Sequence, residues 1–169
     1  MKPDFLIVFV AALIPLVLGF LWYNPKTFGN AWMKAAGVTP ESAKGANMPL
    51  MLGLTYLFSV FIAFTMNFVT IHQWGLMSLL ADNPDVGVPG TAAANELKGL
   101  LDLYGGKFRT FGHGALHGTI TGIFFALPII TINALFERKG FKYIAINAGY
   151  WIVAMLLMGG VVCRYSHIY

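Results

Sequence analysis

The sequence predicts an all-α membrane protein built as a four-transmembrane-helix bundle. Hydrophobic residues make up 57% of the 169 positions and charged residues only 11%, and the mean hydropathy is +0.69. Soluble domains carry about 25% charged residues, so this composition excludes a soluble globular fold. Four long apolar runs without Asp, Glu or Arg provide the crossings, because about 20 apolar residues of helix span the hydrocarbon core of a bilayer.

The four runs belong to a single membrane domain, residues 1–169. The expected crossings are residues 5–23, 49–71, 111–135 and 141–162. The first run follows Lys2, as in a signal peptide, but Asp4 and the lack of a small-x-small cleavage site predict that it is retained. Pro15 and Pro128 should kink the first and third crossings. The even number of crossings places both termini on one side of the membrane.

The first connection predicts a helix that lies in the membrane interface. Asn24 and Pro25 are typical of an N-cap followed by proline at the first helical position, and Gly37 suits the C-cap, so a helix is expected over residues 25–36. Aromatic rings favour the headgroup region. The expected interfacial anchors are Trp22, Tyr23, Pro25, Phe28 and Trp32.

The middle connection, residues 72–110, contains two turn signals and one short helix. Thr91 is a suitable N-cap for an amphipathic helix over residues 92–104, where Leu97, Leu101 and Tyr104 recur at helical spacing. We expect this helix to cap the outer end of the bundle or to rest on the membrane surface. A partner-binding element is the alternative, since long structured connections are often functional.

Charge distribution predicts the partner and the orientation. The net charge is +4, but the basic residues form no continuous stripe, which argues against a nucleic-acid partner and for the membrane surface. The short third connection, residues 137–140, contains Arg138 and Lys139, so the positive-inside rule places it in the cytoplasm. Both termini would then face outward from a bacterial inner (cytoplasmic) membrane.

Because the number of crossings is even, the four histidines should lie at one membrane face. They are His72, His113, His117 and His167. His113 and His117 are one helical turn apart, a spacing that chelates a transition metal when a third ligand converges. His72 is the natural third ligand for Zn, Cu or Fe(II). Haem is disfavoured, because its two axial histidines lie on opposite sides of the macrocycle. The alternative is hydrogen bonding of each imidazole to headgroups, water or backbone carbonyls.

Small and amide side chains in the crossings predict helix packing. Gly114, Gly118 and Gly122 share one face and allow close helix approach, within the bundle or between protomers. Gly149 offers a similar approach in the fourth crossing, while Asn133 and Asn147 flank the last hairpin turn and should hydrogen-bond across it. A substrate site at these amides is the alternative.

Two blocks of the sequence carry a family resemblance. The first comprises residues 22–25, 28–29 and 31–34, and the second residues 133–138, 146–150 and 157–159. Their order and spacing resemble the family called domain of unknown function 1761. The resemblance implies a small polytopic membrane protein of bacterial type and supplies neither an activity nor a catalytic residue.

No nucleophile with its base, phosphate-binding loop or carboxylate pair is apparent, so we expect no enzymatic activity. The predicted role is a non-catalytic structural or accessory subunit that packs with itself or with a larger membrane complex. Bound lipid is expected, and no cofactor is required. Transport of a small solute through an oligomeric bundle is one alternative. A His-lined metal or pH-responsive site at the outer face is the second.

Overall fold

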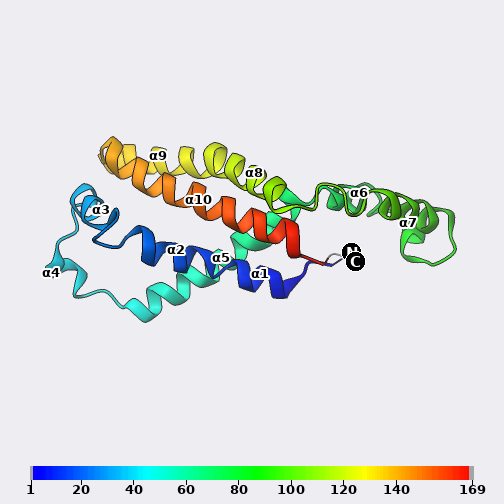
Figure 1. The fold of residues 1–169 in the computed structure, drawn as a ribbon, viewed down its shortest axis with the longest axis horizontal. Coiled ribbons are helices and arrows are strands. Elements are labelled where there is room, and N and C mark those ends of the chain that lie inside the picture. The colour runs from blue at the N-terminus through cyan, green and yellow to red at the C-terminus, as the bar shows by residue number, and fades with distance from the viewer. Residues whose placement is uncertain (1, 168–169) are drawn as a thin grey trace.

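The structure, a computed structural model, describes residues 2–167 except the side chains of Pro40 and Ala43, and every regular element in these residues is helical (Figure 1). The elements are α1 (Phe5–Ala11), α2 (Ile14–Trp22), α3 (Gly29–Ala36), α4 (Pro40–Ala43), α5 (Met48–Thr70), α6 (Gln73–Leu79), η1 (Pro84–Gly87), α7 (Ala92–Tyr104), α8 (Phe111–Thr121), η2 (Gly122–Ala126), α9 (Leu127–Phe136) and α10 (Phe141–Tyr165).

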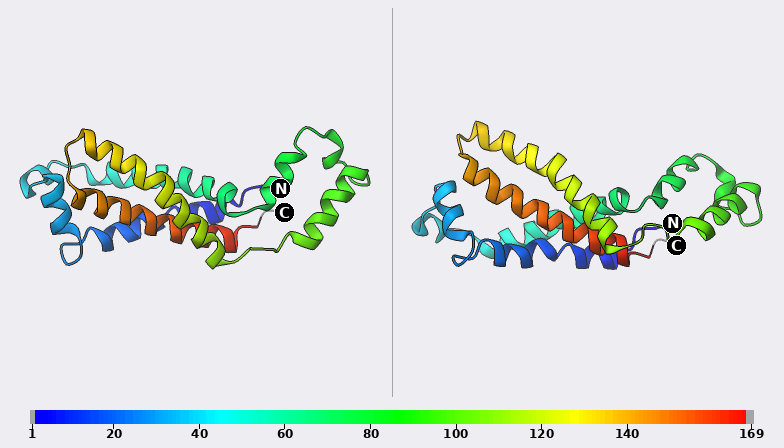
Figure 2. Two further views of the ribbon diagram at one scale, coloured as in Figure 1. Left: turned by 90° about the horizontal axis from the view of Figure 1, so that it is seen from above. Right: turned by 45° about the horizontal axis from the view of Figure 1, so that its top comes forward.

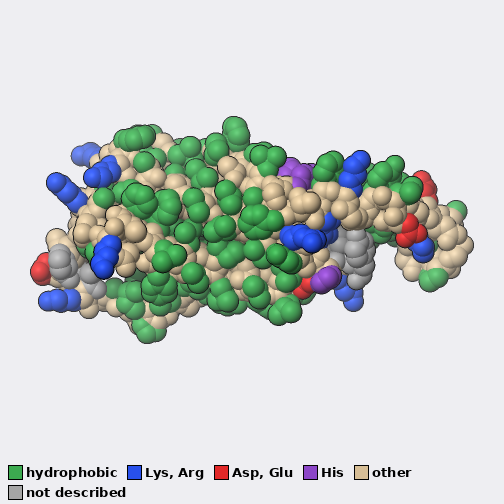
Figure 3. Space-filling model, viewed as in Figure 1, with side chains coloured by type: hydrophobic (Ala, Val, Ile, Leu, Met, Phe, Trp, Pro, Cys, Tyr) green, Lys and Arg blue, Asp and Glu red, His purple; other side chains and the backbone are tan. Residues whose placement is uncertain are grey.

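Four helical segments are long and apolar enough to cross a membrane, as the sequence predicts. They are Phe5–Trp22, Met48–Thr70, Phe111–Phe136 and Phe141–Tyr165. The last, α10, is the most buried of the four, and it packs against α8, α5, α9 and α2 (Figures 1 and 2). Large apolar side chains cover much of the outward face (Figure 3), a surface that suits hydrocarbon rather than water.

Both expected proline irregularities are present. The first segment breaks between α1 and α2, and Pro15 occupies the first turn of α2. In the third segment η2 is a π-turn, in which the Leu127 amide donates to the Gly122 carbonyl just before Pro128. Proline has no amide hydrogen and clashes with the preceding turn. A π-turn is one of the recognised ways in which a helix absorbs such an irregularity.

The helix of the first connection begins at Gly29 rather than at Pro25. Asn24 accepts a hydrogen bond from the Lys26 amide at 2.9 Å, and the Thr27 hydroxyl lies 2.6 Å from a carbonyl oxygen of the preceding helix. These local bonds satisfy the backbone in a tight turn, so the N-cap geometry expected at Asn24 is replaced by an Asx turn. The helix ends at Gly37 in the left-handed conformation (φ +77°), as expected.

The middle connection forms an arm. Thr91 caps α7, accepting from the Ala94 amide at 3.3 Å, and the helix has the bounds expected from the sequence. It packs on α6 and η1 and extends away from the long helices along the molecular axis, rather than lying across their end as a cap (Figures 1 and 2). The Gln73 amide holds the base of this arm by donating to the carbonyls of Tyr104 and Lys107.

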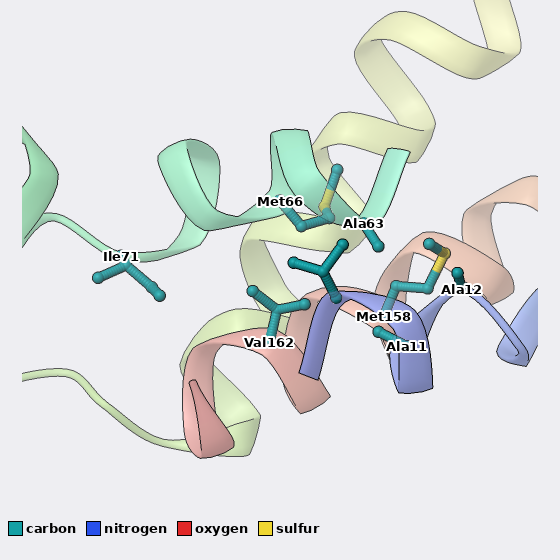
Figure 4. Packing of buried hydrophobic residues seen from close by; sticks show 8 residues of the cluster. Ala11, Ala12, Ala63, Met66, Ile71, Met158 and Val162 are labelled. Carbon is teal, nitrogen blue, oxygen red and sulfur yellow. The ribbon is translucent and has the colours of Figure 1, made fainter. Parts of the chain in front are cut away.

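The apolar core lies towards the end of the long helices from which the arm departs. Its buried side chains come from α1, α5 and α10 and from the residues that directly follow α1 and α5 (Figure 4). They are Val8, Ala11, Ala12, Ala63, Met66, Ile71, Met158 and Val162. The same end holds both termini, where the His167 amide donates to Asp4 Oδ2 at 3.0 Å. We call this the histidine end, and the end with the 137–140 connection the hairpin end.

Candidate metal centre

Three of the four histidines meet at the histidine end. One ligand nitrogen from each of His72, His113 and His117 lies within 4.8 Å of the others. The Nε2 atoms of His72 and His113 are 2.9 Å apart, and the three ring centroids are 4.6 to 5.0 Å from one another. His167 does not belong to this group, although it lies at the same end of the molecule.

The corner between α5 and α6 positions His72. Its preceding neighbour, Ile71, is fully buried in the core, and its following neighbour, Gln73, is buried against the base of the arm. The Ile71 amide also donates to the carbonyl of Asn67, which closes the last turn of α5. Because both flanking side chains point inward, the exposed His72 ring is directed towards α8.

The loop before α8 positions His113. Thr110 caps the helix by accepting from the His113 amide at 3.2 Å. The Phe108 ring stacks on the His113 ring at 5.1 Å and meets His72 edge-on at 6.0 Å. Arg109 anchors the loop to the end of α10, donating to the carbonyls of Cys163 and Ser166. Phe108 has a φ of +63°, a conformation that costs energy for a bulky residue and therefore marks a constrained site.

The glycine face of α8 positions His117. A Cβ atom placed on Gly118 would lie 2.7 Å from the carbonyl carbon of Met155, and one on Gly114 would lie 2.8 Å from that of Gly159. These glycines therefore let the α8 backbone contact the α10 backbone, and Gly122 does the same against Ile152. The packing seam expected from the sequence lies within the chain, and it turns His117 away from α10 towards α5.

The three imidazoles suit a transition metal. A tetrahedral zinc ion with bonds of about 2.0 to 2.1 Å holds its ligand nitrogens about 3.3 Å apart, a value between the 2.9 Å and the 4.8 Å found here. His72 is exposed, and the other two are partly exposed, so an ion can enter from water. Among the described residues, no carboxylate or thiol joins this group.

A second polar cluster lies at the hairpin end around Asn147. Its Oδ1 accepts from Tyr23 Oη at 3.0 Å and from Trp32 Nε1 at 3.2 Å, and its Nδ2 donates to the carbonyl of Tyr143 at 2.8 Å. Burial, together with the neighbouring phenols of Tyr150 and Tyr143, raises the pKa of Tyr23. The Tyr23 hydroxyl therefore stays protonated and can donate its hydrogen bond to Asn147.

The other residues expected at the hairpin end fit this cluster differently. Asn133 and Asn147 line one small pocket of about 210 Å³, but the described hydrogen bonds of the Asn147 side chain go to the first connection and to its own helix, not to Asn133. Gly149 faces the Trp22 ring, which a Cβ atom would approach to 3.3 Å. Phe28 completes the arrangement, with its ring centroid 4.7 Å from that of Trp22.

Sequence reasoning identified every residue of the histidine cluster but missed two of its supports. Phe108 and Arg109 hold the rim of the site, and only their position just before the His113 helix could have drawn attention to them. The sequence also did not predict that the first of the two family blocks contacts the second. Trp22 Nε1 donates to the carbonyl of Ile146 at 3.1 Å, so the two blocks that carry the family resemblance form one cluster.

Comparisons with known proteins agree with that resemblance. No curated protein matches the chain, and no solved structure does. A family match covers residues 6–163, which includes the second and third long segments, all but the outermost residues of the first and fourth, and the three clustered histidines. The chain therefore belongs to the family described as Protein of unknown function (DUF1761).

Proposed function

We propose that this chain is an integral membrane protein that binds a transition metal ion, Zn²⁺ in the first place, through His72, His113 and His117. The observation that carries the proposal is the convergence of three imidazole nitrogens within 4.8 Å. They come from two segments that are 41 residues apart along the chain. Neutral imidazole is a good ligand for zinc, copper and iron, and three histidines that leave a fourth position open are an arrangement found in zinc enzymes.

Hydrogen bonding alone explains the cluster less well. A neutral imidazole has one donor and one acceptor nitrogen, so the 2.9 Å contact between His72 and His113 satisfies one nitrogen on each ring. The third ring, His117, packs 4.6 and 5.0 Å from these two rings. A shared cation explains why three rings meet at one point.

The role as an accessory subunit has less support from the geometry than metal binding. The glycine face expected to mediate association packs against α10 in the same chain. In the aromatic interfacial helix, Trp32 is hydrogen-bonded to Asn147. Both surfaces expected to dock a partner are thus engaged within the protomer.

The proposal includes an orientation. The hairpin end lies in the cytoplasm, because Arg138, Lys139 and Lys142 flank that short turn. The histidine end, the arm and both termini then face outward. In this arrangement α3 lies at the cytoplasmic interface, where Trp32 and Lys34 suit the headgroup region.

Elemental analysis tests the proposal. The protein is purified in mild detergent without a histidine tag, equilibrated with Zn²⁺ and desalted. We expect near-equimolar zinc in the wild type and only background zinc in the His113→Ala, His117→Ala double variant. His167→Ala is the matched control, because His167 lies at the same end but outside the cluster. It should keep the full zinc content.

Two results would reject the metal site. One is a wild-type protein that leaves the desalting column without metal after exposure to zinc, copper and iron(II). The other is a double variant that retains the metal. A variant that fails to fold is recognised by its circular dichroism spectrum, and the single variant His72→Ala, at an exposed position in a corner, then provides the same comparison.

A further inference from the structure

An apolar groove begins at the histidine cluster and runs into the membrane region. It has a volume of about 500 Å³ and lies between α5 and the α8–η2 segment. Its lining residues are Phe61, Ile62, Thr65, Met66, Val69, His117, Ile120, Thr121, Phe125 and Met155. The helices α5 and α8 approach each other near the histidines and diverge towards the hairpin end (Figures 1 and 2). His117 is therefore a member of both the metal cluster and the groove.

The threonine hydroxyls in the walls of the groove are hydrogen-bonded within their own helices. The hydroxyls of Thr65 and Thr121 donate to the carbonyls of Phe61 and His117 on their own helices, at 2.9 Å in both cases. The floor includes Met66, which is 1% exposed. Apart from the imidazole at one end, the groove thus offers only hydrocarbon and aromatic surface. Its volume is within the range of about 300 to 1,000 Å³ that is usual for small-molecule sites.

The far end of the groove coincides with the irregular part of the third segment. Phe125 lies in the π-turn η2 and lines the groove. A π-turn adds a residue to a helical turn and changes the direction of the following side chains, and such turns occur frequently at functional sites. This irregularity and the divergence of α5 from α8 together shape the open side.

The metal site lacks a negative charge. Three neutral imidazoles leave a Zn²⁺ ion with its full charge of +2, and no carboxylate among the described residues joins the cluster. A cation at the edge of a low-dielectric region is stabilised by an anionic ligand, and carboxylate oxygen is a normal ligand of zinc. The open coordination position therefore favours an anion that the protein itself does not supply.

Resting on the proposed metal site, we infer that the groove and the metal together bind a long-chain carboxylate, with its head on the ion and its hydrocarbon tail along α5 and α8. The tail matches the apolar walls, the head supplies the missing charge, and His117 joins the two parts. A single chain fits an open groove of this volume better than a phospholipid, which has two chains and a bulky phosphodiester head.

Cobalt substitution tests this inference. Co²⁺ replaces zinc in the detergent-solubilised protein, and its visible absorption reports a change in the fourth ligand. Palmitate should change the spectrum, whereas methyl palmitate, which has the tail without the carboxylate, should not. Ile120→Trp places an indole in the groove from a position that is 42% exposed, and it should raise the palmitate concentration needed by about tenfold or more.

Matched controls distinguish binding of the hydrocarbon tail in the groove from binding of the carboxylate to the metal. Ile132→Trp adds the same ring to a 54% exposed position outside the groove and should leave the palmitate response unchanged. Acetate, which has no tail, should bind the ion equally in the wild type and in both variants. Thr65→Trp fills the groove from the opposite wall, on a helix that carries none of the three histidines, and should weaken palmitate binding as Ile120→Trp does.

The possible outcomes distinguish the two proposals. If the protein retains neither cobalt nor zinc, the metal site itself is wrong. If cobalt binds but palmitate gives no spectral change, or if both groove variants respond to palmitate like the wild type, the metal site stands and the long-chain ligand is rejected. A response to dipalmitoyl phosphatidate without one to palmitate would also overturn the inference, because it would identify a phospholipid phosphate as the head.

Discussion

Replacement of Gly118 by alanine should separate α8 from α10. The added Cβ would lie 2.7 Å from the carbonyl carbon of Met155 and 3.1 Å from the Cα of Leu156, whereas ordinary contact begins at 3.4 Å. Both neighbours are backbone atoms of a long helix, so no side-chain rotation relieves the clash. Overpacking of this kind costs about 1 to 3 kcal/mol, and we expect the upper half of that range.

The intrinsic preference of the helix works in the opposite direction. Alanine in place of glycine favours a helix interior by about 1 kcal/mol, so the net loss at Gly118 should be about 1 to 2 kcal/mol. Gly112 provides the matched control, because it lies on the same helix and a Cβ there meets nothing within 4 Å. Gly112→Ala should be neutral or slightly stabilising, which leaves about 1 to 3 kcal/mol between the two variants.

Unfolding of the detergent-solubilised protein, followed by circular dichroism as a function of added denaturing detergent, measures this difference. Zinc affinity is the second readout, since His117 precedes Gly118 and should move with α8. The reasoning fails if Gly118→Ala unfolds with the wild-type midpoint. It also fails if Gly112→Ala is destabilised equally, because the effect would then not come from the α8–α10 contact.

Three further predictions concern the two ends of the molecule. Asn147→Leu should cost about 1 to 3 kcal/mol of stability by removing the acceptor of two partly buried donors, whereas Tyr23→Phe, which leaves the bond from Trp32 in place, should cost about 1 kcal/mol. Equal losses in denaturation would contradict this assignment. Zinc retained after desalting should fall as the buffer is acidified from pH 8 to 5, because protons compete with metal for imidazole; retention that is unchanged over this range would indicate other ligands. The variant Arg138→Cys should react with a membrane-impermeant maleimide only after the cells are opened, while the buried native Cys163 stays unlabelled. Labelling of Arg138→Cys in intact cells would reverse the orientation.

The structural elements that depend only on neighbouring residues could be predicted from the sequence. Apolar runs of sufficient length predict the four long helices, and Thr91 and Gly37 predict a helix start and a helix end that the structure contains. The prolines predict where the first and third segments are irregular. Each of these features depends on a few neighbouring residues, for which intrinsic preferences decide the outcome.

The histidine cluster was predictable for a different reason. The end of the second segment and the start of the third must lie at the same membrane face, so His72 and His113 share that face in any four-crossing arrangement. That requirement does not specify a distance, however. The 2.9 Å contact depends on Ile71 entering the core and on the glycine contacts of α8, both of which are tertiary.

The partners of Asn147 could not be predicted from spacing. Its position beside a tight turn favoured Asn133 as its partner, but Tyr23 and Trp32 reach it from more than 110 residues away along the chain. The same long-range contacts explain the late start of α3. The chain must turn between Tyr23 and Gly29 to place Trp32 on α10, and the Asx turn at Asn24 supplies that turn.

Cys163 shows how the two parts of the metal site are connected. It is the single cysteine of the sequence, and its Sγ lies 3.4 Å from the carbonyl oxygens of both Thr70 and Phe108. Thr70 lies two residues before His72, and the Phe108 ring stacks on that of His113. The α5 corner and the rim of α8 therefore meet on one buried side chain of α10. Since α10 packs against every other long segment, a shift of that helix would change the spacing of the imidazoles, and the geometry of the metal site depends on the packing of the whole fold.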